Sequence, residues 1–137
     1  MGFILDSSVL IAAERRGLTV RQMIAGSRAQ LGDVEVGLSV VSLIELAHGV
    51  ARADSMTRKA NREGFLRDLI TALPIHPVSV SLALRTGHLN GDLQSKGIHL
   101  ALADLLIGMT ALELGFGVAT SNVKHFGLIP GLRIVLL

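Results

Sequence analysis

Cysteine is absent from this sequence, and so are tryptophan and tyrosine. Without cysteine the chain can form no disulfide, no thiolate metal site and no cysteine nucleophile. Its only aromatic side chains are four phenylalanines, 3% of the residues. A platform on which single-stranded bases stack needs several exposed aromatic rings. We therefore do not expect this chain to recognise bases by stacking.

Charged residues are scarce as well. They make up 18% of the 137 residues, whereas half of the residues are hydrophobic. This composition excludes an intrinsically disordered chain, and the length predicts one domain over residues 1–137 with a substantial buried core. The formal charge is +2 and the pI is about 9.7. That balance permits an anionic partner such as nucleic acid without requiring one.

Neither a secretory signal nor a membrane span is predicted. No basic segment precedes the first carboxylate, Asp6, as it would in a secretory signal. The most apolar window, residues 100–119, contains Asp104 and Glu113 and two glycines. A carboxylate at the centre of a bilayer costs about 2.5 to 3.5 kcal/mol on insertion scales. We therefore interpret this window as a buried helix followed by a buried strand, and we expect a cytoplasmic protein.

Segments typical of strands and helices alternate along the chain. Short apolar or β-branched runs predict strands at residues 2–5, 34–41, 73–77, 117–120 and 132–137. Apolar residues at helical spacing predict helices at residues 9–15, 19–31, 42–53, 55–73, 79–96 and 102–114, and residues 121–130 are predicted to form a polar loop. Two prolines, Pro74 and Pro77, place the third strand near a sheet edge.

This alternation indicates βαβ crossovers, which produce a parallel sheet covered by helices on both faces. We therefore predict an α/β fold. Its architecture is a three-layer αβα sandwich around a central, mostly parallel sheet of four to five strands.

Asp6 directly follows the first strand, where the sequence reads FILDSS. Ligands of parallel α/β sheets bind beyond the carboxyl ends of the strands, which makes Asp6 a candidate site residue. Aspartate also caps helices, because its carboxylate accepts hydrogen bonds from free amides at a helix start. On the local sequence alone, capping is the favoured interpretation of Asp6.

Three further polar residues occupy comparable positions. Glu45 is predicted at the start of the helix after the second strand, Asp104 in the first turn of the helix before the fourth strand, and Asn122 just after that strand. Each has a structural explanation. Ser42 and Glu45 fit the capping box S-x-x-E, and Asp104 would favour the positive end of a helix dipole. Together, however, the four side chains would meet in one crevice of a doubly wound sheet.

A cluster of carboxylates predicts a bound cation. Two carboxylates about 5 Å apart repel each other by roughly 3 kcal/mol at an effective dielectric of 20, so three of them together would be unstable alone. Oxygen ligands without cysteine suit Mg²⁺ or Mn²⁺. Such an ion can activate water and stabilise charge on a phosphodiester oxygen. The predicted chemistry is phosphodiester hydrolysis.

Four sequence blocks span essentially the whole chain in order: FILDSSVLI, SLIELAHGV, LADLLIGMTALELGFGVATSNVKHF and IPGLRIV. Together these blocks resemble the PIN-domain family, and in particular its VapC-type toxins of toxin and antitoxin pairs. The resemblance implies a Mg²⁺- or Mn²⁺-dependent endoribonuclease, acting as the toxin of a type II toxin-antitoxin system. It also implies a homodimer, an RNA substrate and inhibition by a small cognate antitoxin. The family's metal-binding and catalytic acids carry over to Asp6, Glu45 and Asp104.

The family's fourth acidic position falls on Asn122, which brings an amide oxygen without charge and so puts a second metal ion in doubt. We still place Asn122 among the catalytic residues, in the outer shell of the ion. Thr120 fits the T-x-N pattern of the family and is expected to hold a water or a neighbouring carboxylate. Lys124 and His125 are candidates for binding the substrate phosphate, although an exposed polar loop explains them equally well.

Other functions fit these residues less well. A phosphoacceptor domain needs an aspartate after its third strand, and residues 73–80 contain none. A haloacid-dehalogenase-like phosphatase needs a second aspartate where Ser8 stands. Ser7 and Ser8 have no nearby histidine and aspartate to make a serine hydrolase. The remaining alternative is a non-catalytic PIN-fold binding module, which retention of the three carboxylates argues against.

Overall fold

The computed structural model describes all residues from Met1 to Leu137. The strands are β1 (Gly2–Leu5), β2 (Glu35–Ser39), β3 (Ile75–His76), β4 (Gly117–Thr120) and β5 (Ile134–Leu136). The helices are α1 (Ser7–Arg15), α2 (Val20–Leu31), α3 (Val40–Ala51), α4 (Met56–Ala72), α5 (Val80–Ser95), α6 (Leu102–Leu114) and α7 (Val123–Phe126). None of the helices has both the length and the hydropathy needed to cross a bilayer.

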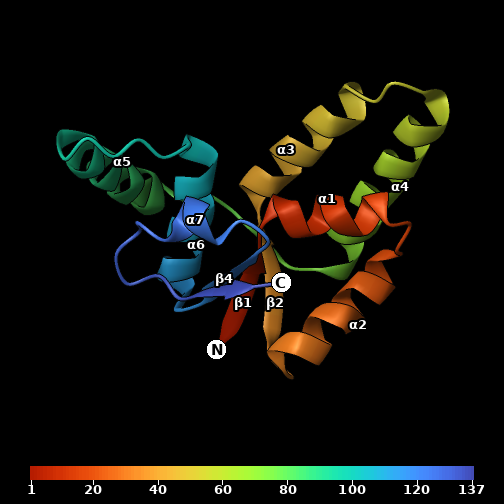
Figure 1. Cartoon of the computed structure of the whole chain (residues 1–137), viewed down its shortest axis with the longest axis horizontal. Coiled ribbons are helices and arrows are strands. Elements are labelled where there is room, and N and C mark those ends of the chain that lie inside the picture. Colours follow the sequence, from red (N-terminus) through yellow and green to blue (C-terminus); the bar gives the residue numbers. More distant parts are fainter.

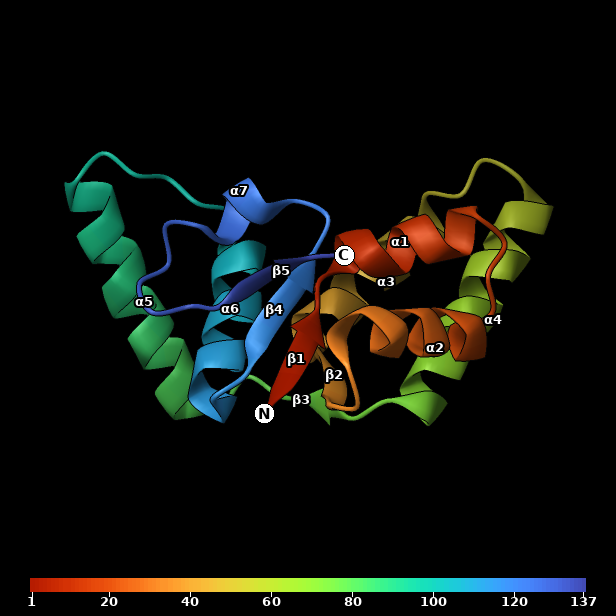
Figure 2. The same cartoon turned by 60° about the horizontal axis from the view of Figure 1, so that its bottom comes forward.

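The five strands form one parallel sheet in the order β3-β2-β1-β4-β5. Helices lie on both sides of it, with α1, α2 and α4 on one side and α5 and α6 on the other (Figures 1 and 2). The predicted αβα sandwich is confirmed, with five strands that are all parallel. Because β1 is the central strand, the residue that follows it enters the middle of the sheet's carboxyl edge.

Two hydrophobic cores hold the helices to the sheet. Successive side chains of a strand point to opposite faces, and β1 supplies both cores in this way. Phe3 and Leu5 pack against α1, α2 and α4, whereas Ile4 packs against α5 and α6. Phe3, Ile4 and Leu5 are at most 1% exposed. This burial explains why the strand reads as continuous apolar sequence.

The start of α3 differs from the prediction. The segment expected to be strand up to Val41 turns into helix at Val40, because the Ser39 hydroxyl caps the helix by accepting a 3.1 Å hydrogen bond from the Val41 amide. The predicted capping box is therefore wrong. Ser42 lies inside the helix, where it is fully buried and its hydroxyl has no partner, and Glu45 is in the second turn.

The segment after β4 also differs from the prediction. The expected loop contains the single-turn helix α7, because Phe126 is fully buried against α6 and draws the chain inwards. The last strand is shorter than predicted, with three residues. The third strand has only two residues and lies at the sheet edge, as its flanking prolines predicted.

Gly117 tests the packing of the central strands. A Cβ atom there would lie 2.8 Å from the buried ring of Phe3 and 3.0 Å from the carbonyl oxygen of Arg133, the residue before β5. We expect Gly117→Ala to lower the free energy of unfolding by about 2 kcal/mol, measured by denaturant titration. A matched change, Gly87→Ala on α5, meets no atom within 4 Å and should raise it by about 0.5 to 1 kcal/mol. Equal stability of the two variants would contradict this packing.

Candidate active site

Asp6 is the buried centre of a network at the carboxyl edge of the sheet. Its residue is 4% exposed. One oxygen, Oδ1, accepts a 2.8 Å hydrogen bond from the Ser7 amide, so Asp6 does cap α1. The other, Oδ2, accepts 2.8 Å hydrogen bonds from the hydroxyls of Ser8 and Thr120. A carboxylate offers about four lone-pair sites, so three protein donors leave one site free.

Thr120 lies where the sequence placed it, and its hydroxyl holds a neighbouring carboxylate as expected. It is the last residue of β4 and is fully buried. Because β4 is the neighbour of β1 in the sheet, its hydroxyl reaches Asp6. The hydroxyl oxygen of Thr120 also accepts a 2.9 Å hydrogen bond from the backbone amide of Asn122. Thr120 therefore ties the turn after β4 to the carboxylate after β1.

Glu45 approaches this network from α3. Its Oε1 accepts a 2.5 Å hydrogen bond from the Ser7 hydroxyl, while the Ser7 amide donates to Asp6. Ser7 thus joins two carboxylates that are 39 positions apart in sequence. This role of Ser7 and Ser8 is not among the sequence predictions, which concern the two hydroxyls only as nucleophiles. The signal was the pair of hydroxyls directly after Asp6.

Asp104 lies near these carboxylates, in the first turn of α6. Its side chain is 19% exposed, and its Oδ2 lies 3.4 Å from Nδ1 of His125. Burial is the largest cause that raises the pKa of this carboxyl, followed by the negative charge of Asp6, and Glu45 adds to it. His125 opposes the rise. Charges on Asp6 and Glu45 therefore act on Asp104.

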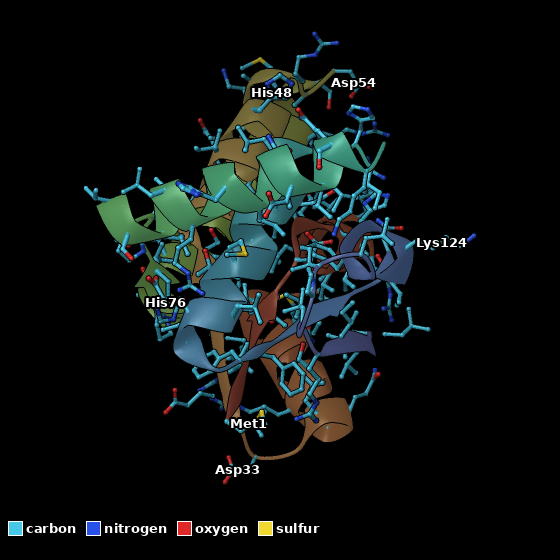
Figure 3. All side chains as sticks on the ribbon, turned by 90° about the vertical axis from the view of Figure 1, so that its left-hand side faces the viewer. Met1, Asp33, His48, Asp54, His76 and Lys124 are labelled. Carbon is cyan, nitrogen blue, oxygen red and sulfur yellow. The ribbon has the colours of Figure 1, made fainter.

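The remaining predicted residues lie on the rim. Asn122 is exposed and precedes α7, and its side chain makes no hydrogen bond. His125 is 54% exposed and contacts Asp104, which joins it to the crevice. Lys124 extends outwards from α7, away from the body of the protein (Figure 3). The structure thus brings His125 to the carboxylates and leaves Lys124 apart from them.

The donor set fits a hard divalent cation. It consists of three carboxylates with no sulfur ligand, and such oxygen donors are the ligands that Mg²⁺ and Mn²⁺ prefer. The pKa of Asp104 is raised first by burial and then by the negative charges of Asp6 and Glu45, and a cation would offset the charge part of this rise. In the present arrangement, however, no three acidic or histidine side chains are close enough to share one ion. The carboxylates would have to draw closer to hold it.

A sequence profile of the PIN domain matches residues 3–128. The chain belongs to the PIN-domain family. It is 28% identical over 135 residues to "Ribonuclease VapC1" of Rickettsia felis, covering 98% of this chain and 96% of that protein. It is 31% identical over 108 residues to "tRNA(fMet)-specific endonuclease VapC" of Salmonella typhimurium, covering 78% and 79%.

A solved structure has the same fold. The chain superposes on VapBC2 of Rickettsia felis, solved bound to a DNA fragment from its promoter, with a TM-score of 0.83. The sequences are 23% identical, and the match covers 100% of this chain and 99% of that one. This likeness confirms the αβα fold, while the family assignment comes from the PIN-domain match.

Because the folded chain disfavours the charged form of Asp104, we expect Asp104→Asn to raise the stability of the fold by an amount that depends on pH. Below the ordinary value of 3.8 the carboxyl is protonated both in the folded and in the unfolded chain. Above it the folded chain holds the proton more tightly, so this group's contribution to stability falls as pH rises. At pH 7 without metal we expect the variant to be more stable by about 1 kcal/mol, or roughly 3 °C in Tm.

Thermal unfolding in EDTA across a pH series checks this expectation. The gain should shrink as the pH is lowered towards 3.8, where the wild-type carboxyl also becomes neutral. A gain that stays constant with pH would mean that the amide stabilises the fold for another reason.

Proposed function

We propose that this chain is a divalent-metal-dependent endoribonuclease and the toxin of a toxin-antitoxin pair. The observation that carries the proposal is the meeting of Asp6, Glu45 and Asp104 at one edge of the sheet, where burial, and after it the charges of Asp6 and Glu45, raise the pKa of Asp104. Such a cluster disfavours the folded state when it is empty. A site for a cation and a phosphodiester explains why the fold would carry it.

The three carboxylates would hold one Mg²⁺ or Mn²⁺. When bound, the cation supplies the positive charge that stabilises negative charge developing on a phosphodiester oxygen. Asp6 is already fixed by three donors, which makes it the rigid member of the set. Ser7 orients Glu45, whose second oxygen is free to position water. Asn122 completes the outer shell and brings no further charge.

The proposal that the substrate is RNA rests on the names of similar proteins. Two relatives matched over 96% of their length are called ribonucleases, and one matched over 79% of its length is called a tRNA(fMet)-specific endonuclease. Identities of 28% and 31% to two of them support the reaction class. The choice among transfer, messenger and ribosomal RNA is a separate matter, which a substrate panel decides.

Cleavage of a labelled panel of structured and unstructured RNAs by purified protein tests the proposal. We expect cutting with Mn²⁺ or Mg²⁺, none in EDTA, and a loss of about a hundredfold or more in Asp6→Asn and in Asp104→Asn, because each removes charge from the ion's site. The matched control is Asp92→Asn, an exposed carboxylate on α5, which should cut normally.

Two outcomes would contradict parts of this proposal. A carboxylate whose loss leaves full activity is not part of the mechanism. If folded protein free of any partner cuts no RNA with any metal, the chain is a non-catalytic binding module of the PIN fold.

A small antitoxin and a second copy of this chain are the proposed partners. Support comes from the similar structures, several of which are described as VapBC complexes or toxin-antitoxin complexes. Apolar surface is available for a homodimer, since Ile44 on α3 is 66% exposed and Leu84 on α5 is 61% exposed. We propose that the antitoxin inserts a segment near the crevice, with an arginine that contacts the carboxylates.

Co-expression of the tagged chain with the genes of its native operon tests the partner. A small protein should co-purify with the chain and suppress its cleavage of RNA, and replacing the partner's arginines one by one should restore cleavage. A pull-down that yields no small partner counts against the antitoxin.

A further inference from the structure

A pocket lies beside Glu45, enclosed by α1, α3 and α4. α1 contacts both other helices and lies next to the hairpin that they form (Figure 1). The pocket holds about 90 Å³, and Glu45 is in its wall. One water needs about 10 to 15 Å³ on this scale, so the space admits roughly six waters. That is room for one planar ring and too little for a larger ligand.

The walls of this α1–α4 pocket combine two chemistries. Ile11, Leu46 and Phe65 give it an apolar lining, and Glu14, Arg15 and Arg62 bring charge to it. Arg62 donates a 2.6 Å hydrogen bond to the Gly49 carbonyl, which fixes the guanidinium and leaves its other donors free. Neither of the chain's two ion pairs involves Glu14 or Arg15. Both charged groups therefore remain free to bind a ligand.

The pocket also lies at a useful distance from the proposed cleavage centre. α1 follows Asp6 directly, and Glu14 lies on it eight residues after Asp6. At 1.5 Å per residue this is about 12 Å, a distance that a few nucleotides of an RNA strand can span. Glu45 belongs both to the crevice and to the pocket wall. An RNA strand in the crevice would therefore pass the pocket within a few nucleotides.

We propose that the α1–α4 pocket binds one nucleobase of the RNA substrate close to the cleaved bond. Glu14 accepts a hydrogen bond from an amino group of that base, and Arg15 and Arg62 bind the neighbouring phosphate. An apolar cavity suits the faces of a base, and the two guanidinium groups complement its phosphate. This inference rests on the proposed ribonuclease function and adds a site that selects the base.

The charged residues of the α1–α4 pocket favour a nucleotide over an apolar side chain as its ligand. An apolar side chain of a protein would fill the same cavity but would leave Glu14 and Arg15 without a partner. A nucleotide satisfies the carboxylate and the guanidinium together, since it carries both donors and a phosphate. The space fits a single-ring base, and at position 4 cytosine carries an amino group where uracil carries a carbonyl oxygen that would face the carboxylate, so the pocket should prefer cytosine over uracil. This recognition uses hydrogen bonds and needs no stacking platform.

Arg15 and Arg16 provide a matched pair for the phosphate contact. They are adjacent, both are exposed, and each loses one positive charge on replacement by glutamine. Only Arg15 lines the α1–α4 pocket. Binding of fluorescein-labelled oligocytidylate is followed by fluorescence anisotropy in EDTA, where no cleavage is needed. We expect Arg15→Gln to weaken binding about tenfold and Arg16→Gln by about twofold or less. Equal loss in both variants would overturn the proposal.

Glu14→Gln tests the base contact, with Glu63→Gln on α4 as its control, because Glu63 is exposed and lies outside this pocket. The wild type should bind oligocytidylate more tightly than oligouridylate. Glu14→Gln should reduce this preference about fivefold or more, and Glu63→Gln should keep it. An unchanged preference in Glu14→Gln, or no preference in the wild type, overturns the proposal.

The two proposals fail separately. Pocket-dependent binding by a protein that cuts no RNA would leave the base site standing and remove the nuclease. Cleavage with identical parameters in wild type, Arg15→Gln and Glu14→Gln would keep the nuclease and remove the base site. Tighter binding of an apolar peptide in the pocket, with RNA binding unchanged in every variant, would assign the cavity to a protein partner and overturn the inference.

Discussion

The buried carboxylate of Asp6 is the constraint on which the candidate site depends. A charge at the end of the central strand needs hydrogen bonds from its surroundings, because burial removes its water. The chain supplies them from two directions: the first turn of α1 and the end of β4. Since β1 and β4 are neighbours in the sheet, this network also fixes where α1 leaves the sheet. Fold and candidate chemistry therefore share one set of contacts.

The clustering of charge has an energetic consequence for the whole edge of the sheet. Burial raises the pKa of Asp104 most, and the charges of Asp6 and Glu45 add to the rise, so the folded chain holds this carboxylate against both lost hydration and repulsion. Ser7 moderates this by donating to both Asp6 and Glu45. A protein optimised for stability alone would replace one carboxylate with a neutral group. Retention of all three is characteristic of sites whose strain serves binding or catalysis.

Helices α1 and α3 extend from this acidic edge towards positive charge. α1 starts beside Asp6 and ends at Arg15, and α3 carries Glu45 and is followed by Arg52. The acidic residues suit a cation, and the basic helix ends suit a polyanion. Basic helix ends next to an acidic cluster suit an RNA strand, whose phosphates would contact the basic residues while one phosphodiester lies at the acidic residues.

The sequence by itself determined the layer architecture and the approximate position of the site. Continuous apolar strands alternating with amphipathic helices admit little except a covered parallel sheet, and Asp6 and Thr120 stand out by their places at strand ends, and Asp104 by its place in the first turn of a helix. The capping box predicted at Ser42 is wrong, because Ser39 caps the same helix three residues earlier. Tertiary structure alone decided the Ser7 bridge to Glu45, the helix around buried Phe126 and the contact of His125 with Asp104. These depend on packing between segments far apart in sequence, which no local pattern records.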